Sequence, residues 1–339
     1  MLPTEHTSVE ICAGAGGQAL GLEMAGFAHA ALVEIDSHAC ATLRLNRPAW
    51  NVLHGDVANW DGRPYRGVDL LAGGVPCPPF SKAGYQLGPD DERDLFPSML
   101  RLVEEIEPRV VMIENVRGLL DPRFDVYRGA INQRLRQLGY APSWRLLHAS
   151  DFGVPQLRPR VICVATRDEY APFFRWPQPT GGPPPTVGQA LLCEMNRNGW
   201  EGASDWAARA DRIAPTLVGG SKKHGGPDLG PTRARRAWAD LGINGKTIAD
   251  EAPQPGFEGT PSLTVGMAAI VQGFPKSWRF AGRKTAAYKQ VGNAFPPPVA
   301  AAVGAMIAAA LRKVDESEWR GGQLPWQPVL VLDPSFAVI

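Results

Sequence analysis

Cysteine is scarce in this sequence. The 339 residues include five cysteines, which stand singly and show neither the CxxC nor the CxxH spacing of a structural zinc site. We therefore expect no metal centre. Sparse, isolated cysteine suits a reducing compartment, so a cytoplasmic location is expected.

Long apolar runs are also absent. No stretch reaches the roughly 18 residues that a membrane span needs, and the amino terminus lacks the basic region and apolar stretch of a signal peptide. We expect no membrane partner. The formal net charge of +1 excludes no partner, because nucleic-acid binding depends on local basic patches. No internal repeat is found.

The first 167 residues alternate predicted strands with predicted helices. Strands are predicted at 8–12, 30–34, 52–56, 68–72, 110–113 and 161–165, and helices at 18–26, 37–46, 95–105 and 131–138. Ser37 is the predicted N-cap of the second helix. The alternation is typical of an α/β fold with a doubly wound, mostly parallel sheet.

The composition and periodicity of the sequence change at about residue 168. Proline and glycine cluster at 177–185 and 219–231, and the periodic signals weaken. We expect a second, smaller and loop-rich domain there. Regular structure returns at 264–272 and in the alanine-rich helix 299–311, whereas 319–339 is ambiguous.

Five polar features stand at predicted carboxyl ends of strands, which is where α/β sheets of this type bind ligands. They are the glycine loop 13–17, Glu34, Asp56, Cys77 and Glu114. Cys77 lies in a Gly-Gly-Val-Pro-Cys-Pro-Pro run, where the prolines and glycines favour a rigid, exposed turn. The alternative for Cys77 is a small buried hydrophobe.

The first three features describe a pocket for adenosine. A carboxylate at Glu34 suits a ribose diol, and Asp56 suits the exocyclic amine of adenine. The loop 13–17 lacks the GxGxxG spacing of a dinucleotide site, so S-adenosylmethionine (SAM), which has no phosphate, fits better. The alternative is that Glu34 and Asp56 are helix-capping or solvated acids.

Five blocks in order resemble the cytosine-5 DNA methyltransferases of bacterial restriction-modification systems. They are Ala-Gly-Ala-Gly-Gly at 13–17, Pro-Cys at 76–77, Glu-Asn-Val at 114–116, Gln-Leu-Arg-Pro-Arg at 156–160 and Gln-Val-Gly-Asn-Ala at 290–294. The resemblance implies a Rossmann-like, SAM-dependent methyltransferase fold. It implies a catalytic domain over 1–167 plus about 280–315, a target-recognition domain over about 168–279, and a tail over 316–339.

The resemblance also implies a mechanism. Cys77 would add to carbon 6 of a flipped-out cytosine, which makes carbon 5 nucleophilic. Glu114 would hold or protonate ring nitrogen 3, with a raised pKa in the closed site. Arg160 would contact the base carbonyl or the surroundings of the nucleophile, and Asn115 would orient local backbone.

Cofactor contacts carry over to thirteen positions. Asn293 is expected in a turn before the last helix, near the methionine part of SAM, and that helix is expected to pack on the first domain. The family often has aromatic residues where this chain has Cys12 and Ile35. We therefore expect the adenine to lie between non-aromatic side chains that hold it less firmly. The full set is Cys12, Ala13, Gly14, Gly16, Gly17, Glu34, Ile35, Asp56, Val57, Pro76, Leu95, Asn293 and Ala294.

Double-stranded DNA is the implied partner. Residues 81–88 resemble the loop that closes over DNA, and the glycine-rich basic segment 219–226 follows one that resembles the approach to a DNA-reading loop. Asn196–Trp206 is a second candidate reading loop. The expected DNA contacts are Ser81, Gln86, Arg93, Arg158, Lys222, Lys223, His224 and Arg233, with Arg158 on a backbone phosphate.

Three other functions would each account for only part of the sequence. An RNA cytosine methyltransferase would typically carry a Cys-Phe-Thr tripeptide, which this chain lacks. A DNA-binding member without activity would lack Cys77 or Glu114. An NAD oxidoreductase would explain only the glycine loop. The enzyme is expected to act as a monomer in the bacterial cytoplasm, and the sequence leaves open its target site and a cognate restriction endonuclease.

Overall fold

The computed structural model describes residues 6–76, 94–219 and 227–314. Within these residues one sheet has seven strands in the order β3-β2-β1-β4-β5-β7-β6, and β7 alone runs antiparallel to the other six. This confirms the doubly wound, mostly parallel sheet. The strands are β1 (His6–Ile11), β2 (Phe27–Glu34), β3 (Val52–His54), β4 (Leu70–Gly73), β5 (Val110–Val116), β6 (Tyr140–His148) and β7 (Pro159–Arg167).

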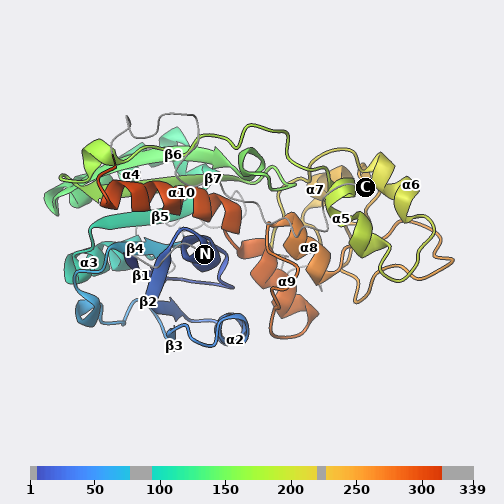
Figure 1. The fold of residues 1–339 in the computed structure, drawn as a ribbon, viewed down its shortest axis with the longest axis horizontal. Coiled ribbons are helices and arrows are strands. Elements are labelled where there is room, and N and C mark those ends of the chain that lie inside the picture. The colour runs from blue at the N-terminus through green and yellow to red at the C-terminus, as the bar shows by residue number, and fades with distance from the viewer. Residues whose placement is uncertain (1–5, 77–93, 220–226, 315–339) are drawn as a thin grey trace.

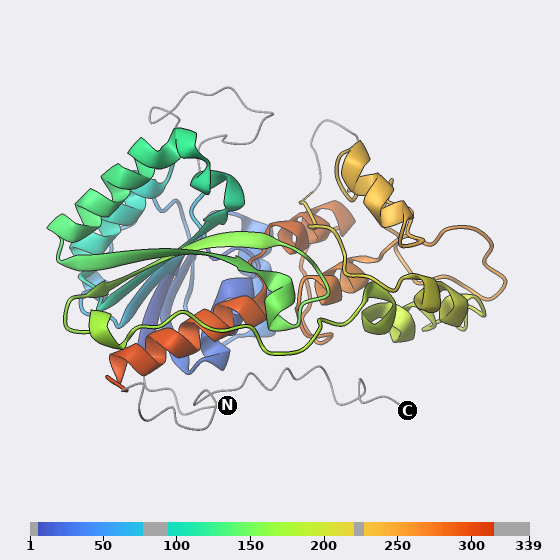
Figure 2. The ribbon, with the colours of Figure 1, turned by 90° about the horizontal axis from the view of Figure 1, so that it is seen from above.

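Helices cover both faces of the sheet (Figures 1 and 2). Helices α3 (Phe96–Ile106) and α4 (Asp125–Gln137) bury apolar side chains on one face, and α1 (Gly17–Met24) and α10 (Pro297–Leu311) on the other. Helix α2 (Ser37–Asn46) lies beside β2 and β3. The return of α10 to the sheet confirms the expected packing of the last predicted helix.

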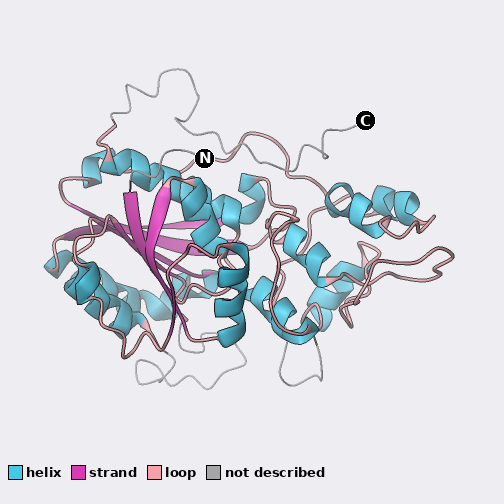
Figure 3. Cartoon of the chain, turned by 60° about the horizontal axis from the view of Figure 1, so that its bottom comes forward, coloured by secondary structure: helices cyan, strands magenta, loops and turns pink. Residues whose placement is uncertain are grey.

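A smaller region made of helices and loops lies beside the sheet (Figure 3). Its helices are α5 (Val187–Met195), α6 (Ala203–Arg209), α7 (Thr232–Ala239), α8 (Val265–Val271) and α9 (Lys284–Asn293). They enclose a separate core around Trp206 and Trp238. Tyr288 and Val291 of α9 also belong to this core, whereas Tyr170 packs with the sheet. The same core includes Leu20 of α1, so packing connects the two regions. The expected division at about residues 168 and 279 stays a prediction.

Short 3-10 helices complete the connections. They are η1 (Arg63–Tyr65), η3 (Arg117–Leu120), η4 (Pro122–Phe124), η5 (Ala149–Phe152) and η6 (Ala171–Phe173). One stretch, Lys284–Leu311, has the length and mean hydropathy of a membrane span, but 94% of its most apolar window is buried inside the protein. It comprises α9, which packs in the core of the smaller region, and α10, which packs against the sheet.

Two local predictions need correction. The N-cap of α2 is Asp36 rather than Ser37, because the Asp36 Oδ1 accepts hydrogen bonds from the backbone N–H groups of His38 (2.8 Å) and Ala39 (3.2 Å). Strand β6 was not predicted. It is an edge strand containing Pro142, and proline weakens a strand signal while being tolerated at a sheet edge.

Candidate cofactor and catalytic site

The glycine loop connects β1 to α1 through left-handed backbone. Cys12, Gly14 and Gly16 have φ angles of 53°, 54° and 84°. Glu34, at the end of β2, is bonded to this loop: its Oε2 accepts the Gly14 N–H at 2.7 Å, and its Oε1 accepts the Asp36 N–H at 2.8 Å. The structure therefore brings together the loop and the acid that the sequence singled out.

Apolar side chains lie on the α3 side of this loop. Cys12, Val57 and Leu95 pack in one cluster, and Ile35 is 64% exposed at the end of β2. Burial, with Glu34 nearby, raises the pKa of the Cys12 thiol to about 12, so the thiol stays neutral and forms an apolar wall. Asp56 is exposed, and its Oδ1 accepts the Ala58 N–H at 2.9 Å.

The junction between α9 and α10 lies against the start of α1. A methyl group on Gly17 would lie 2.1 Å from the Phe295 carbonyl oxygen and 3.3 Å from the Ala294 Cβ. Asn293 is the last residue of α9, so the expected turn lies at residues 294–296 instead. The Asn293 Oδ1 is close to Gly219, where a methyl group would approach it to 2.3 Å. Ala13 is buried and Pro76 is exposed.

The ends of β4 and β5 form the candidate catalytic edge. These strands are parallel neighbours, with Gly73 opposite Ile113. The Glu114 carboxyl lies over Gly74, where a methyl group would be 3.1 Å from the Glu114 Oε2. The Asn115 amide donates to the Val75 carbonyl oxygen at 3.0 Å. This bond confirms that Asn115 orients local backbone, here in the segment leading to Cys77.

Glu114 and Arg160 form an ion pair across β5 and β7. The Arg160 Nε lies 2.7 Å from the Glu114 Oε1, and both side chains are nearly buried, at 12% and 13% exposed. Burial raises the pKa of the Glu114 carboxyl despite the attraction of Arg160 and Arg158. The pair therefore holds a carboxyl in place while its surroundings favour the protonated form.

Arg158 does not reach the surface. It is 1% exposed. Its Nη1 donates to the Leu217 carbonyl oxygen at 2.7 Å, and its Nη2 donates to the carbonyl oxygens of Gly292 (2.9 Å) and Ala294 (2.8 Å). Burial lowers the pKa of this guanidinium well below its ordinary value. The predicted contact of Arg158 with a DNA phosphate is wrong, because these donors face the interior.

Several predicted site residues lie outside the described residues. Arg233 is described and lies exposed in the first turn of α7. Residues without a described position are Cys77, Ser81, Gln86, Arg93, Lys222, Lys223 and His224. Their roles stay predictions.

Two residues near the cofactor loop were missed by sequence reasoning. The indole Nε1 of Trp278 donates to the Ala15 carbonyl oxygen at 3.1 Å, so the segment before α9 holds the loop. Glu10 lies in β1, 1% exposed and close to Gln18, and burial raises the pKa of its carboxyl well above the ordinary value. No signal marks the contact of Trp278, whereas an acid inside an apolar strand could have drawn attention to Glu10.

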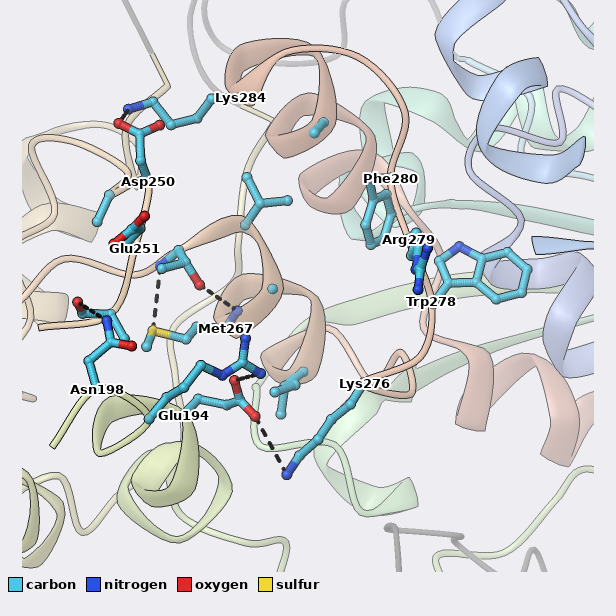
Figure 4. Close-up of a pocket in the computed structure, with 18 of the residues that line it drawn as sticks. Glu194, Asn198, Asp250, Glu251, Met267, Lys276, Trp278, Arg279, Phe280 and Lys284 are labelled. Carbon is cyan, nitrogen blue, oxygen red and sulfur yellow. Dashed lines mark hydrogen bonds and ion pairs between the residues drawn. The ribbon is translucent and has the colours of Figure 1, made fainter. Parts of the chain in front are cut away.

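An open groove of about 660 Å³ lies between α5, α8 and the segment leading into α9 (Figure 4). Two lysines of its lining pair with acids of its lining: Lys284 with Asp250 at 2.8 Å, and Lys276 with Glu194 at 3.6 Å. Its lining includes Arg197 and Asn198 of the candidate reading loop 196–206, and Trp278, whose indole bonds to the cofactor loop. The groove therefore adjoins that candidate loop and, through Trp278, the cofactor loop. No cluster of three metal-ligating side chains occurs in the part of the chain that the structure describes.

The fold and the site define a class. The strand order is that of a Rossmann-like methyltransferase fold. The site consists of a glycine loop after β1, an acid after β2 and an ion-paired carboxyl at the end of β5. A profile of the family described as C-5 cytosine-specific DNA methylase matches residues 6–309. The chain belongs to this family and is a DNA cytosine-5 methyltransferase.

Named relatives agree with this assignment, and a solved structure shares the fold. The chain is 58% identical over 318 residues to the type II methyltransferase M.NaeI of Lentzea aerocolonigenes, covering 92% of this chain and 77% of the relative. It is 55% identical over 312 residues to M.NgoMIV of Neisseria gonorrhoeae, covering 91% and 99%. A Spodoptera frugiperda DNMT2 structure has a TM-score of 0.64 at 17% identity and covers 90% of this chain and 100% of that one, which shows a shared fold.

Proposed function

We propose that this chain is a SAM-dependent DNA (cytosine-5-)-methyltransferase that modifies one short double-stranded site within a restriction-modification system. The observation that best supports this proposal is the buried Glu114–Arg160 ion pair beside Gly74, at the strand end that leads to Cys77. Two relatives above 50% identity are named type II methyltransferases, which supports the restriction-modification context.

The residues around the glycine loop fit SAM better than a phosphate-containing cofactor. The Gly14 N–H already donates to the Glu34 carboxylate, so this amide is occupied and its acceptor carries negative charge. A phosphate there would meet repulsion in place of the usual free amides. The Glu34 oxygens retain lone pairs for a ribose diol. Cys12, Val57 and Leu95 offer an apolar surface to an adenine ring.

The remaining proposed contacts follow the family pattern. Ile35 and Asp56 would flank the adenine, and the loop with Pro76, Asn293 and Ala294 would enclose the methionine part. When bound, SAM supplies an electrophilic methyl group. Ser81, Gln86, Arg93, Lys222, Lys223, His224 and Arg233 are the proposed DNA contacts.

The chain's own residues supply the covalent chemistry. The Cys77 thiolate adds to carbon 6 of the flipped cytosine, and Glu114 donates a hydrogen bond or proton to ring nitrogen 3, which takes up the electron pair. Carbon 5 would then take the methyl group that bound SAM supplies, and S-adenosylhomocysteine would leave. Loss of the carbon 5 proton to solvent re-forms the double bond between carbons 5 and 6 and expels the Cys77 thiolate, while ring nitrogen 3 returns its proton to Glu114. Arg160 keeps the Glu114 carboxyl oriented toward Gly74.

A methyl-transfer assay tests this proposal. Purified protein is incubated with methyl-labelled SAM and plasmid DNA, transfer RNA or no nucleic acid, and the labelled base is identified after hydrolysis. We expect label only in DNA, as 5-methylcytosine, with loss of transfer in Cys77→Ala but not in Cys193→Ala, which changes an exposed cysteine. Label in RNA alone, or none from folded protein that binds SAM, would refute the proposal.

We further propose a monomer in the bacterial cytoplasm, paired with a restriction endonuclease of the same specificity. The relatives named above are bacterial. Size-exclusion chromatography with light scattering tests the monomer, and protection of methylated plasmid from a candidate endonuclease tests the pairing.

A further inference from the structure

A buried set of polar side chains lies where the sheet meets the smaller region. Gln156, Arg158 and Gln272 are each at most 1% exposed. The proposed chemistry uses none of them. Among the described residues, the Arg158 guanidinium bonds to backbone carbonyl oxygens and to no carboxylate. Such a buried cation costs more free energy than an apolar replacement of similar size, so its presence requires an explanation.

The side chains of Gln156 and Arg158 bond to both the N–H group and the carbonyl oxygen of Leu217. The Gln156 Oε1 accepts the Leu217 N–H at 2.7 Å, and the Arg158 Nη1 donates to the Leu217 carbonyl oxygen at 2.7 Å. Leu217 ends the segment 213–217, which stands directly before the glycine-rich basic segment proposed to read DNA. Its backbone is therefore fixed from the side of the sheet.

Backbone pairing extends the same connection. The Ala214 N–H donates to the Pro155 carbonyl oxygen at 2.9 Å, and the Leu157 N–H donates to the Ala214 carbonyl oxygen at 2.9 Å. The two segments thus pair in one isolated parallel β-bridge between Gln156 and Ala214. Beyond this bridge, the side chains of Gln156 and Arg158 bond to Leu217.

The network also reaches the cofactor side. The Arg158 Nη2 and the Gln272 Nε2 both donate to the Ala294 carbonyl oxygen, and Ala294 lies against Gly17. Gln156 is connected to Gln272 by a bond of 2.8 Å from its Nε2 to the Gln272 Oε1. One network therefore contacts the DNA-reading approach and the junction beside the cofactor loop.

The network also lies next to strand β7, which carries Arg160. Arg158 stands two residues before Arg160, so the two side chains project from the same face of the extended backbone. Arg160 holds Glu114. Both Nη atoms of Arg158 are bonded, whereas its buried Nε has no hydrogen-bond partner among the described residues. A buried network of hydrogen bonds specifies one geometry more sharply than apolar packing does, because each bond has a direction.

We propose that Gln156 and Arg158 are positioning residues that keep the described segment 213–217, which precedes the proposed DNA-reading segment in the sequence, in register with the Glu114–Arg160 pair and the cofactor loop. This inference rests on the proposed function. It explains the cost of the buried guanidinium: a fork of donors reaches Leu217, Gly292 and Ala294 at once, which no apolar side chain and no single-point donor can do.

The test compares Arg158→Lys and Gln156→Met with Arg212→Lys. Arg212 is a matched control because it also bonds a carbonyl oxygen, that of Asp240, but has an exposed side chain outside the network. For each protein we would measure the melting temperature, SAM affinity, kcat and KM on DNA carrying the mapped site, and methylation at sites differing by one base pair.

We expect Gln156→Met, which keeps the Arg158 bonds to Gly292 and Ala294, to bind SAM within about twofold of wild type, and Arg158→Lys to bind SAM more weakly than Gln156→Met. The two network variants share the following expectations. Their kcat/KM on the mapped site should fall by about 10- to 100-fold, the size expected when reacting groups are displaced by about 1 Å. Preference over the altered sites should also fall. Arg158→Met, which loses every donor, should be weaker than Arg158→Lys, and Arg212→Lys should match wild type.

A merely structural role predicts a different result. The melting temperature and the active fraction would fall, while kcat, KM and site preference per folded molecule stayed at wild-type values, and this outcome would overturn the proposal. If Arg158→Lys does not fold, Gln156→Met decides by the same readouts, because it keeps all three Arg158 bonds. An inactive wild type would instead refute the proposed function, independently of the variants.

Discussion

At the scale of single residues, burial sets the charge state of the acids. Glu114 and Glu10 both have raised pKa values because little water reaches them, but only Glu114 has a cation beside it. Sequence reasoning found Glu114 because it ends a predicted strand beside another strand end. It misjudged Arg158, because two arginines in one short block give no sign of whether either one faces a bound ligand or the protein interior.

Replacing Glu114 tests its proposed role. Glu114→Gln removes the transferable proton while keeping an oxygen that can accept from Arg160, so single-turnover methyl transfer should fall about 100- to 10,000-fold. SAM affinity should be unchanged. Glu104→Gln, which alters an exposed acid paired with Arg134, serves as the control. Transfer by Glu114→Gln within threefold of wild type would remove Glu114 from the mechanism.

Replacing Glu10 tests the effect of burial on stability. Its folded pKa is raised, so between about pH 4.5 and that folded value the unfolded chain binds fewer protons than the folded one, and stability falls as pH rises. Glu10→Gln keeps the shape without the charge. It should therefore raise the melting temperature at pH 7, by about 2 °C for each 1 kcal/mol gained.

The control for this change is Glu258→Gln, which alters an exposed acid. The difference in melting temperature between Glu10→Gln and wild type should grow from pH 4.5 upward. A difference that is constant with pH, or a less stable variant at pH 7, would contradict a protonated carboxyl at Glu10.

At the scale of elements, periodicity predicted those helices and strands that have one clear apolar face. Helix α2 has the predicted bounds, and β1, β2, β4 and β5 lie where strands were predicted, because their apolar residues fill the two faces of the sheet. Strand β6 was missed, since polar residues and Pro142 interrupt its pattern. Helix α9 was also not predicted, because its sequence Lys-Thr-Ala-Ala-Tyr-Lys-Gln-Val-Gly-Asn carries few large apolar residues and a glycine near its end. The turn expected before the last helix exists but lies at residues 294–296.

Close packing of α1 on α10 gives a prediction at this scale. A methyl group on Gly21 would lie 2.4 Å from the Pro297 carbonyl oxygen and 2.5 Å from the Ala300 Cβ. Gly21→Ala should therefore destabilise the protein by about 1–3 kcal/mol, the usual cost of overpacking. Chemical denaturation would measure the change.

The matched variant is Gly129→Ala in α4, where an added methyl group meets no atom within 4 Å among the described residues. There the higher helix propensity of alanine should stabilise the protein by up to about 1 kcal/mol. Equal effects of the two substitutions would mean that α1 and α10 do not pack as described.

At the scale of the whole molecule, the two regions are held together by bonds between distant parts of the chain. Thr42 in α2 donates to the Gln290 Oε1 in α9 at 2.6 Å, and Trp278 bonds to Ala15. Sequence patterns predicted that the last helix returns to the sheet, but not these contacts. Their partners are far apart in the chain, and each residue alone resembles an ordinary surface or core residue.

The most direct test of the central claim is cytosine-methylation sequencing of plasmid DNA from cells that express this chain, beside cells that express Cys77→Ala. The account predicts complete methylation of cytosine at one short motif with the wild type and background levels with the variant. Unmethylated DNA from folded protein that binds SAM, or equal methylation in both samples, would contradict it.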